Sequence, residues 1–81
     1  MGMISIQYEI FGAVRTNFKE NSGTISLPEG TSLHDFIVTR AGLEEKYLRY
    51  LDVTVDGRKY PFEGKLQSGM KIKVLMPIGG G

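Results

Sequence analysis

The chain has 81 residues and a formal net charge of +1, from 10 basic and 9 acidic residues, and it contains no cysteine. This length allows one domain with a small core, and the lack of cysteine excludes a disulfide framework, a thiolate zinc site, a cysteine nucleophile and a cysteine-ligated iron–sulfur cluster. The near-neutral charge, the lack of an apolar run of about 20 residues and the lack of a signal-peptide pattern lead us to expect a cytoplasmic protein with no nucleic-acid or membrane partner.

Two strands are expected in the first third of the chain. Apolar and polar residues alternate over Met3–Phe11, with isoleucines and Tyr8 on one side and polar residues on the other. A period of two is typical of a half-buried strand. A shorter strand is predicted over residues 24–27, with Ile25 and Leu27 pointing inward and Pro28 ending it.

A helix is expected to begin after Ser32. Ser32 and Asp35 have the spacing of a capping box, in which the Ser32 hydroxyl accepts from the Asp35 amide and the carboxylate returns to the Ser32 amide. Apolar residues follow at helical spacing, and Gly42 stands where a left-handed C-terminal cap would lie. A second, shorter helical segment over residues 43–51 is expected to continue this apolar face, with these members: Leu43, Tyr47, Leu48 and Leu51.

The rest of the chain indicates a hairpin and a last strand. Residues 53–55 and 58–60 flank Asp56-Gly57, a pair favoured in type I′ turns. Leu66 is expected to enter the core from the loop that follows. In the last strand we expect alternation between an inward set and an outward set, namely Ile72, Val74 and Met76 against Lys71, Lys73 and Leu75.

This order of elements predicts an α+β fold of the β-grasp (ubiquitin-like) type, a mixed sheet of about five strands packed on one main helix plus a short second helix. The first and last strands are the most regular, so we expect them to be parallel neighbours at the centre of the sheet. The predicted organisation is a single domain over residues 1–78, followed by a flexible glycine tail over residues 79–81.

The side chains offer little for catalysis. His34 is the only histidine and has no metal ligand or nucleophile at a useful spacing, while Glu44 and Glu45 are adjacent and would diverge on a helix. No glycine-rich phosphate loop follows a strand. We therefore expect no catalytic residue, no metal site and no bound cofactor. Four basic residues could gather on the outer face of the sheet, although an ordinary solubilising surface explains them as well: Arg58, Lys59, Lys71 and Lys73.

The remaining candidate is the carboxylate at the end of Met76-Pro77-Ile78-Gly79-Gly80-Gly81. Glycine has no Cβ, so a terminal Gly-Gly can thread a narrow channel and deliver its carboxyl group to a nucleotide. A terminal carboxylate with a pKa of about 3.3–3.7 is ionised and is a poor electrophile, so another protein would have to activate it. A frayed end without a function is the alternative.

Several segments, in this order, resemble the ThiS/MoaD family of ubiquitin-like sulfur carriers. They are residues 8–15 (YEIFGAVR), residues 27–33 (LPEGTSL), residues 53–57 (VTVDG), Leu66 followed by Gly69, and the ending from Pro77 to the glycines. The two-part helical region and the length are more similar to MoaD, the small subunit of molybdopterin synthase, than to the shorter thiamine-pathway carrier. The chain departs from the family in ending with three glycines instead of two, and in Ser68-Gly69-Met70, where an acidic residue often stands beside the glycine.

The resemblance implies a carrier, not an enzyme by itself, whose last glycine is adenylated by an E1-like adenylyltransferase and converted into a thiocarboxylate. The activating partner would use ATP and a sulfur donor, and the thiocarboxylate would donate sulfur in molybdopterin (molybdenum cofactor) biosynthesis, inserted into the large subunit of molybdopterin synthase. The reactive carboxylate would belong to Gly81, or to Gly80 if the third glycine is trimmed or is an added residue. Gly79, Ile78 and Pro77 would form the threading segment.

Phe11 and Leu75 are expected to contact a partner, because each falls on the face opposite its strand's buried set. Packing at a strand end is an equal alternative for both. Two other functions also stay open. A ubiquitin-like modifier would join the same activated tail to lysines, and a non-covalent β-grasp interaction domain would carry an inert tail.

Overall fold

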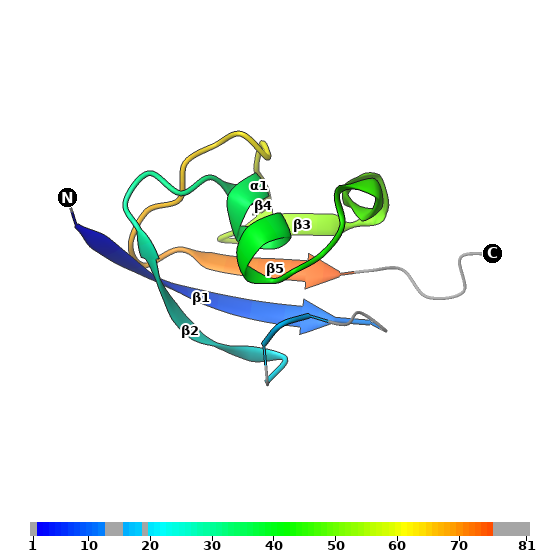
Figure 1. Ribbon diagram of the computed structural model, residues 1–81, viewed down its shortest axis with the longest axis horizontal. Coiled ribbons are helices and arrows are strands. Elements are labelled where there is room, and N and C mark those ends of the chain that lie inside the picture. Colours follow the sequence, from blue (N-terminus) through cyan, green and yellow to red (C-terminus); the bar gives the residue numbers. More distant parts are fainter. Residues whose placement is uncertain (1, 13–15, 19, 76–81) are drawn as a thin grey trace.

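The computed structural model describes residues 2–12, 16–18 and 20–75, so the last six residues lie outside the described part. The elements run in the order β1 (Met3–Phe11), β2 (Ser22–Pro28), α1 (Leu33–Asp35), a π-helical turn η1 (Phe36–Arg40), a 3₁₀ helix η2 (Glu45–Tyr50), β3 (Asp52–Val55), β4 (Arg58–Lys59) and β5 (Lys71–Leu75). Figure 1 shows the strands as one sheet with the helical segments against it.

The five strands form one mixed sheet in the order β2-β1-β5-β3-β4. β1 and β5 are parallel neighbours inside the sheet, with Gln7 opposite Lys71 and Phe11 opposite Leu75. β2 pairs antiparallel with β1, and β3 pairs antiparallel with both β5 and β4. The predicted β-grasp architecture, with its parallel first and last strands, is therefore confirmed.

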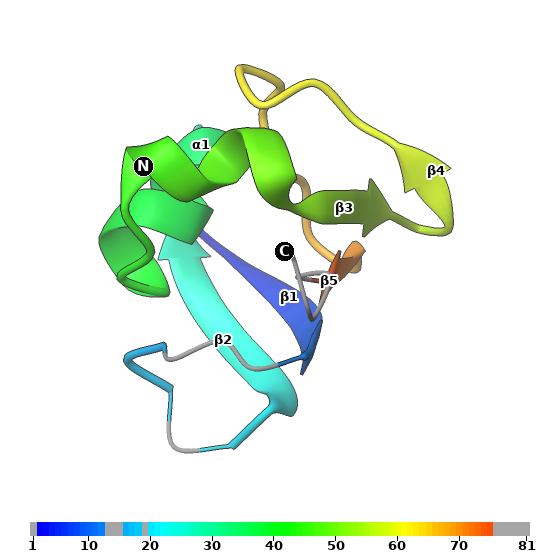
Figure 2. The same ribbon diagram turned by 90° about the vertical axis from the view of Figure 1, so that its right-hand side faces the viewer.

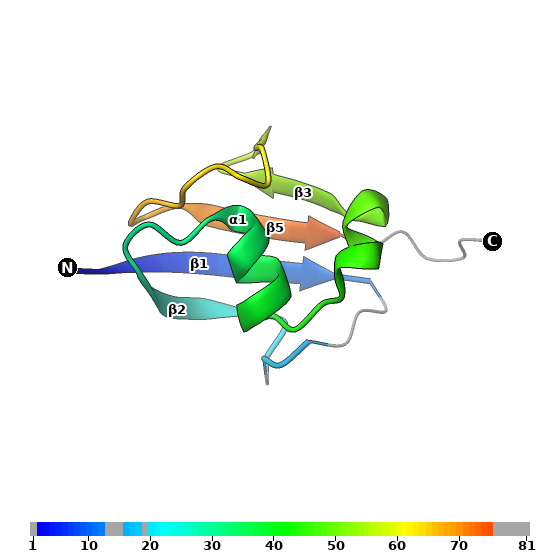
Figure 3. The same cartoon turned by 45° about the horizontal axis from the view of Figure 1, so that its top comes forward.

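The helical segments lie on one side of the sheet (Figure 2), and η2 lies near the end of the sheet where β1 and β5 finish (Figure 3). Alternation in β1 points the predicted set inward, and in β5 it does so for Ile72 and Val74, while Met76 lies outside the described residues. Leu66 is buried as expected. Phe36 and Ile37 are fully buried between the helical layer and the strands. Tyr8 joins this core by stacking on Phe18, with the ring centroids 4.3 Å apart.

The helix begins where the sequence predicts, but it is not regular. The Asp35 amide donates to Ser32 Oγ at 3.1 Å, which confirms the cap, whereas the Asp35 carboxylate lies 3.6 Å from His34 Nδ1 instead of returning to Ser32. After one α-helical turn the backbone widens, so that the Ala41 amide donates to the Phe36 carbonyl at 2.9 Å. Gly42 then takes φ +81°, which confirms the expected left-handed cap.

In the second helical segment, one residue that was expected on the buried apolar face is exposed. Leu48 and Leu51 are half-buried, but Tyr47 is exposed, so the prediction for Tyr47 was wrong. The reason is the helix type: with three residues per turn, positions three apart share a face. Leu48 and Leu51 therefore face the core together, and Tyr47 turns outward together with Tyr50.

The turn between β3 and β4 agrees with its sequence. Asp56 and Gly57 have φ angles of 54° and 83°, the positive pair that a type I′ turn requires. The Asp56 carboxylate also accepts from the Lys71 amide at 2.9 Å, which ties the turn to the start of β5. β2 extends beyond the four residues expected, because Ser22 and Gly23 also pair with β1, opposite Glu9 and Tyr8.

Candidate functional site

The predicted reactive end lies outside the described residues. This holds for Gly81 and Gly80, and equally for the threading segment of Gly79, Ile78 and Pro77, so their roles stay predictions. The structure does describe the strand that precedes this segment in the chain. β5 ends at Leu75, inside the sheet and next to the end of β1.

Phe11 and Leu75 lie side by side at that end. Their Cα atoms are register partners in the parallel pair of β1 and β5, and the side chains are 46% and 42% exposed. Both side chains belong to the outer face, the sheet face away from the helical segments, because their neighbours Ile10 and Val74 are buried on the other face. The structure therefore brings together two exposed apolar residues that are 64 positions apart in the sequence.

Asp52 completes this end of the outer face. It opens β3, is exposed, and pairs with Leu75 on the side away from Phe11. We call these three residues, Phe11, Leu75 and Asp52, the tail root. The tail root thus presents two apolar side chains with one carboxylate beside them.

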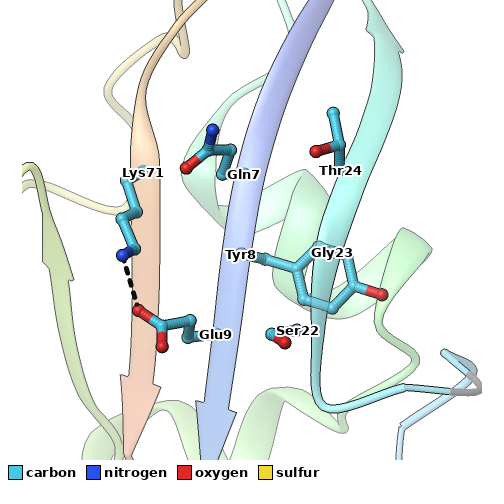
Figure 4. A pocket seen from close by; sticks show the side chains of 7 residues that line it. All are labelled: Gln7, Tyr8, Glu9, Ser22, Gly23, Thr24 and Lys71. Carbon is cyan, nitrogen blue, oxygen red and sulfur yellow. Dashed lines mark ion pairs between the residues drawn. The ribbon is translucent and has the colours of Figure 1, made fainter.

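Behind the tail root, the outer face is polar and carries an ion pair. Lys71 Nζ lies 2.9 Å from Glu9 Oε1, as Figure 4 shows. The hydrogen bond from Lys71, together with the charges of Lys71 and Lys73, lowers the pKa of the Glu9 carboxyl group, although desolvation acts in the opposite direction. Glu9 is therefore held as an anion between two lysines.

The four basic residues expected to gather on the outer face do so only in part. Lys59 and Lys73 both pair with Thr54, so they lie in one row across β4, β3 and β5. Lys71 is on the same face but is occupied by Glu9. Arg58 pairs with Val55, whose side chain is buried, so the register places Arg58 on the helix side of the sheet.

The outer face also has a shallow hollow between β1, β2 and β5. Figure 4 shows its polar lining, with Gln7 and Glu9 from β1, Thr24 from β2 and Lys71 from β5. Within residues 2–12, 16–18 and 20–75, no polar side chain is buried and no group of three metal-ligating side chains converges. No helix in the described part of the chain is long and apolar enough to span a bilayer.

One contact was missed by the sequence analysis. His34 Nε2 forms a close ion pair with Glu45 Oε1, which joins α1 to η2. The hydrogen bond to Glu45 is the main reason why the pKa of His34 is raised, with Asp35 adding to it and desolvation opposing it. No spacing rule points to this pair, because the two residues come together only through the bend at Gly42.

No protein-family model matches the chain, and no curated protein matches it by sequence. Among the solved structures that share its fold are the following two. A protein from Pyrococcus furiosus, provisionally named molybdopterin converting factor, subunit 1, is 21% identical, with a TM-score of 0.67 over 93% of this chain and 99% of that one. SAMP1 from Haloferax volcanii is 14% identical, with a TM-score of 0.72 over 95% of this chain and 99% of that one.

Proposed function

We propose that this chain is a sulfur carrier whose C-terminal glycine is adenylated, converted into a thiocarboxylate and used as a sulfur donor in molybdopterin biosynthesis. The observation that supports it most is the position of the tail root. A strand from the interior of the sheet ends at Leu75, so the last described residue before the glycine ending lies in the sheet, beside the exposed Phe11. The fold shared with the Pyrococcus furiosus protein is compatible with this proposal.

The chemistry requires a partner. A carboxylate oxygen of the last glycine attacks the α-phosphate of ATP, pyrophosphate leaves, and an acyl-adenylate forms. A hydrosulfide ion then attacks the acyl carbon, AMP leaves, and a thiocarboxylate and a proton remain. An E1-like adenylyltransferase would bind the ATP and hold the transition states, because the described part of this chain has no buried polar side chain with which to do so.

The tail root would be the docking contact for that partner. Burial of Phe11 and Leu75 in an interface removes apolar surface from water, and each side chain is large enough to act as an anchor. The same surface would serve, in a later step, for the large subunit of molybdopterin synthase. Because a single surface would serve both, the two partners would bind in turn.

The proposal is tested by intact-mass spectrometry after incubation with ATP, sulfide and an E1-like enzyme from the same cell. The expected result is a mass gain equal to the exchange of one oxygen for sulfur, mapped to the last glycine by fragmentation. Gly2→Ala is the matched control, because Gly2 precedes β1 at the other end of the sheet and should leave the mass gain intact. An unchanged carboxylate, with the enzyme active on another carrier, would refute the proposal.

The same reaction mixture separates sulfur transfer from protein conjugation. If a lysine amine were the acceptor, trypsin would cut after Lys73 and leave the remaining residues, Val74 to Gly81, attached to the target lysine. A carrier gives the thiocarboxylate without such branched peptides. Branched peptides without a thiocarboxylate would assign the chain as a modifier instead.

A further inference from the structure

The two edges of the sheet differ in a way that the proposed tail chemistry does not explain. One edge is β4, which has two residues, both basic. The other edge is β2, which has seven residues, Ser22–Pro28, and no charged side chain. Exposed edges are normally protected by short length, charge, bulges or proline, because unpaired backbone groups attract another strand. β4 has such protection, whereas β2 has only Pro28 at its end.

The hydrogen bonds identify which groups of β2 face outward. The Ile10 amide donates to the Asn21 carbonyl at 2.7 Å, and the Glu29 amide donates to the Gly2 carbonyl at 2.9 Å. Hydrogen-bonded and non-hydrogen-bonded pairs alternate along an antiparallel ladder, so odd-numbered residues of β2 bond to β1. The outward groups belong to three residues with no backbone partner among the described residues: Ser22, Thr24 and Ser26.

We propose that β2 pairs with β2 of a second copy of this chain, antiparallel and around a two-fold axis at Thr24. In this register Thr24 lies opposite Thr24 of the other copy, and Ser22 lies opposite Ser26. Each outward N–H and C=O of the three residues then gains a partner, and Pro28, which has no N–H, falls beyond the paired segment. The contact is isologous and closes after two copies.

The side chains favour a second copy over an unrelated strand. On the helix side of the sheet, the register places Ile25 of one copy opposite Gly23 of the other. Ile25 is only half-buried in the single chain, and the Tyr8 ring lies over Gly23, since the Tyr8 Oη is 3.1 Å from the position of a Cβ at residue 23. Ile25 of one copy would therefore pack against Gly23 of the other copy, next to the hydroxyl end of the Tyr8 ring, and become buried across the two-fold axis.

Charge does not oppose this pairing. β2 has no ionisable side chain to face itself, and the whole chain carries a net charge of only +1. The two-fold axis is perpendicular to the sheet, so the outer faces of both copies lie on the same side. The two tail roots point to opposite ends of the joined sheet, and each remains free for a partner.

Sedimentation equilibrium over a series of concentrations tests the pairing. Unmodified protein should shift from monomer to dimer, and Thr24→Pro should remain monomeric, because proline removes the outward N–H without touching a bond to β1. Thr24→Val is the matched control, because it keeps the N–H and a β-branched side chain, and it should associate like the unmodified protein. Circular dichroism of each variant shows that the fold is kept.

A second pair of variants does not depend on proline being tolerated. S22K/S26K places lysines opposite each other twice across the axis and should weaken association about tenfold. S22K/S26E carries the same number of changes but places opposite charges together, and it should associate at least as well as the unmodified protein. Both positions are exposed on the outer face, so neither change disturbs the core.

Two results would overturn the proposal. One is a monomer at every concentration. Binding of a peptide from another protein to β2 would not rescue the proposal in that case, because the proposed partner is a second copy of this chain. The other is a dimer that persists in both Thr24→Pro and S22K/S26K, because its contact would then lie elsewhere on the chain. Either result leaves the tail chemistry untouched, since the mass-spectrometric assay does not depend on association.

Discussion

The turn residues Asp56 and Gly57 show how strongly one backbone conformation restricts the choice of residue. Both have positive φ, but only glycine adopts that region without a steric penalty. A Cβ at Gly57 would meet no atom within 4 Å. A side chain at this position would therefore lower stability only through the strain of its positive φ angle, and not through a clash.

Gly57→Ala is therefore expected to lower the free energy of unfolding by about 1 kcal/mol, with no change in partner binding. Gly2→Ala is the matched control, because the Cβ would lie 4.0 Å from Glu29 Oε2 and the φ angle of Gly2 is not positive. Urea denaturation measures both. Equal stability of the two variants would show that the turn relaxes without strain.

His34 predicts a dependence of stability on pH. Its folded pKa is raised chiefly by the hydrogen bond to Glu45, so the protonated histidine stabilises the native state. This stabilisation is complete below the unfolded pKa of about 6.5 and disappears as the pH rises through the raised folded value. The free energy of unfolding should thus fall with increasing pH in this window. His34→Gln removes the titrating group and should flatten the profile, while Glu45→Gln should reduce its slope. Identical slopes in all three proteins would contradict the assignment to this pair.

At the scale of elements, the parallel pair of β1 and β5 decides what surrounds the start of the tail. Because the two strands end together, Phe11 and Leu75 lie side by side as exposed register partners on the outer face. If the two strands ended at different places in the sheet, the two apolar side chains would not be neighbours. The helical layer contributes less, since α1 and η1 lie on the opposite side of the sheet.

Phe11→Ala and Leu75→Ala should each raise the KM for adenylation roughly tenfold, because each removes an anchor from the proposed docking contact. Stability should change little, since both side chains are exposed in the unbound chain. Met3→Ala is the control, because Met3 is a 64% exposed apolar residue on the outer face at the other end of β1. Steady-state kinetics with the E1-like enzyme decides the matter. If Met3→Ala raised the KM equally, docking would depend on exposed apolar surface in general and not on the tail root.

At the scale of the whole molecule, folding and function are expected to be separable. The core residues of the described part come from the strands of the sheet and from the helical layer. Glycine has no side chain to bury, so the last residues add no apolar side-chain area to that core.

Deleting Gly80 and Gly81 should therefore leave the free energy of unfolding within about 0.5 kcal/mol of the unmodified value and abolish thiocarboxylate formation. Thermal and urea unfolding measure the first effect, and intact-mass spectrometry measures the second. Retained partner binding and retained biological activity after the deletion would instead favour an interaction domain with an inert tail.

The sequence by itself determined most of the element order. The alternation in Met3–Phe11, the cap at Ser32 and the Asp56-Gly57 turn are local signals, and each depends on neighbours along the chain, so each could be read without a structure. The parallel central pair also followed, because the crossover rules leave few ways to connect these strands.

Only the tertiary structure decided how distant residues meet. In the folded chain the helix widens into a π turn before Gly42, Tyr47 points outward, and His34 pairs with Glu45. These features differ from the local expectation because packing between segments outweighs local helical preference. The tertiary structure also separated Arg58 from the lysines of the outer face and left β2 as an uncharged edge. Strand pairing sets register and neighbours through hydrogen bonds between distant parts of the chain, and the local patterns of the sequence do not reveal which residues those bonds join.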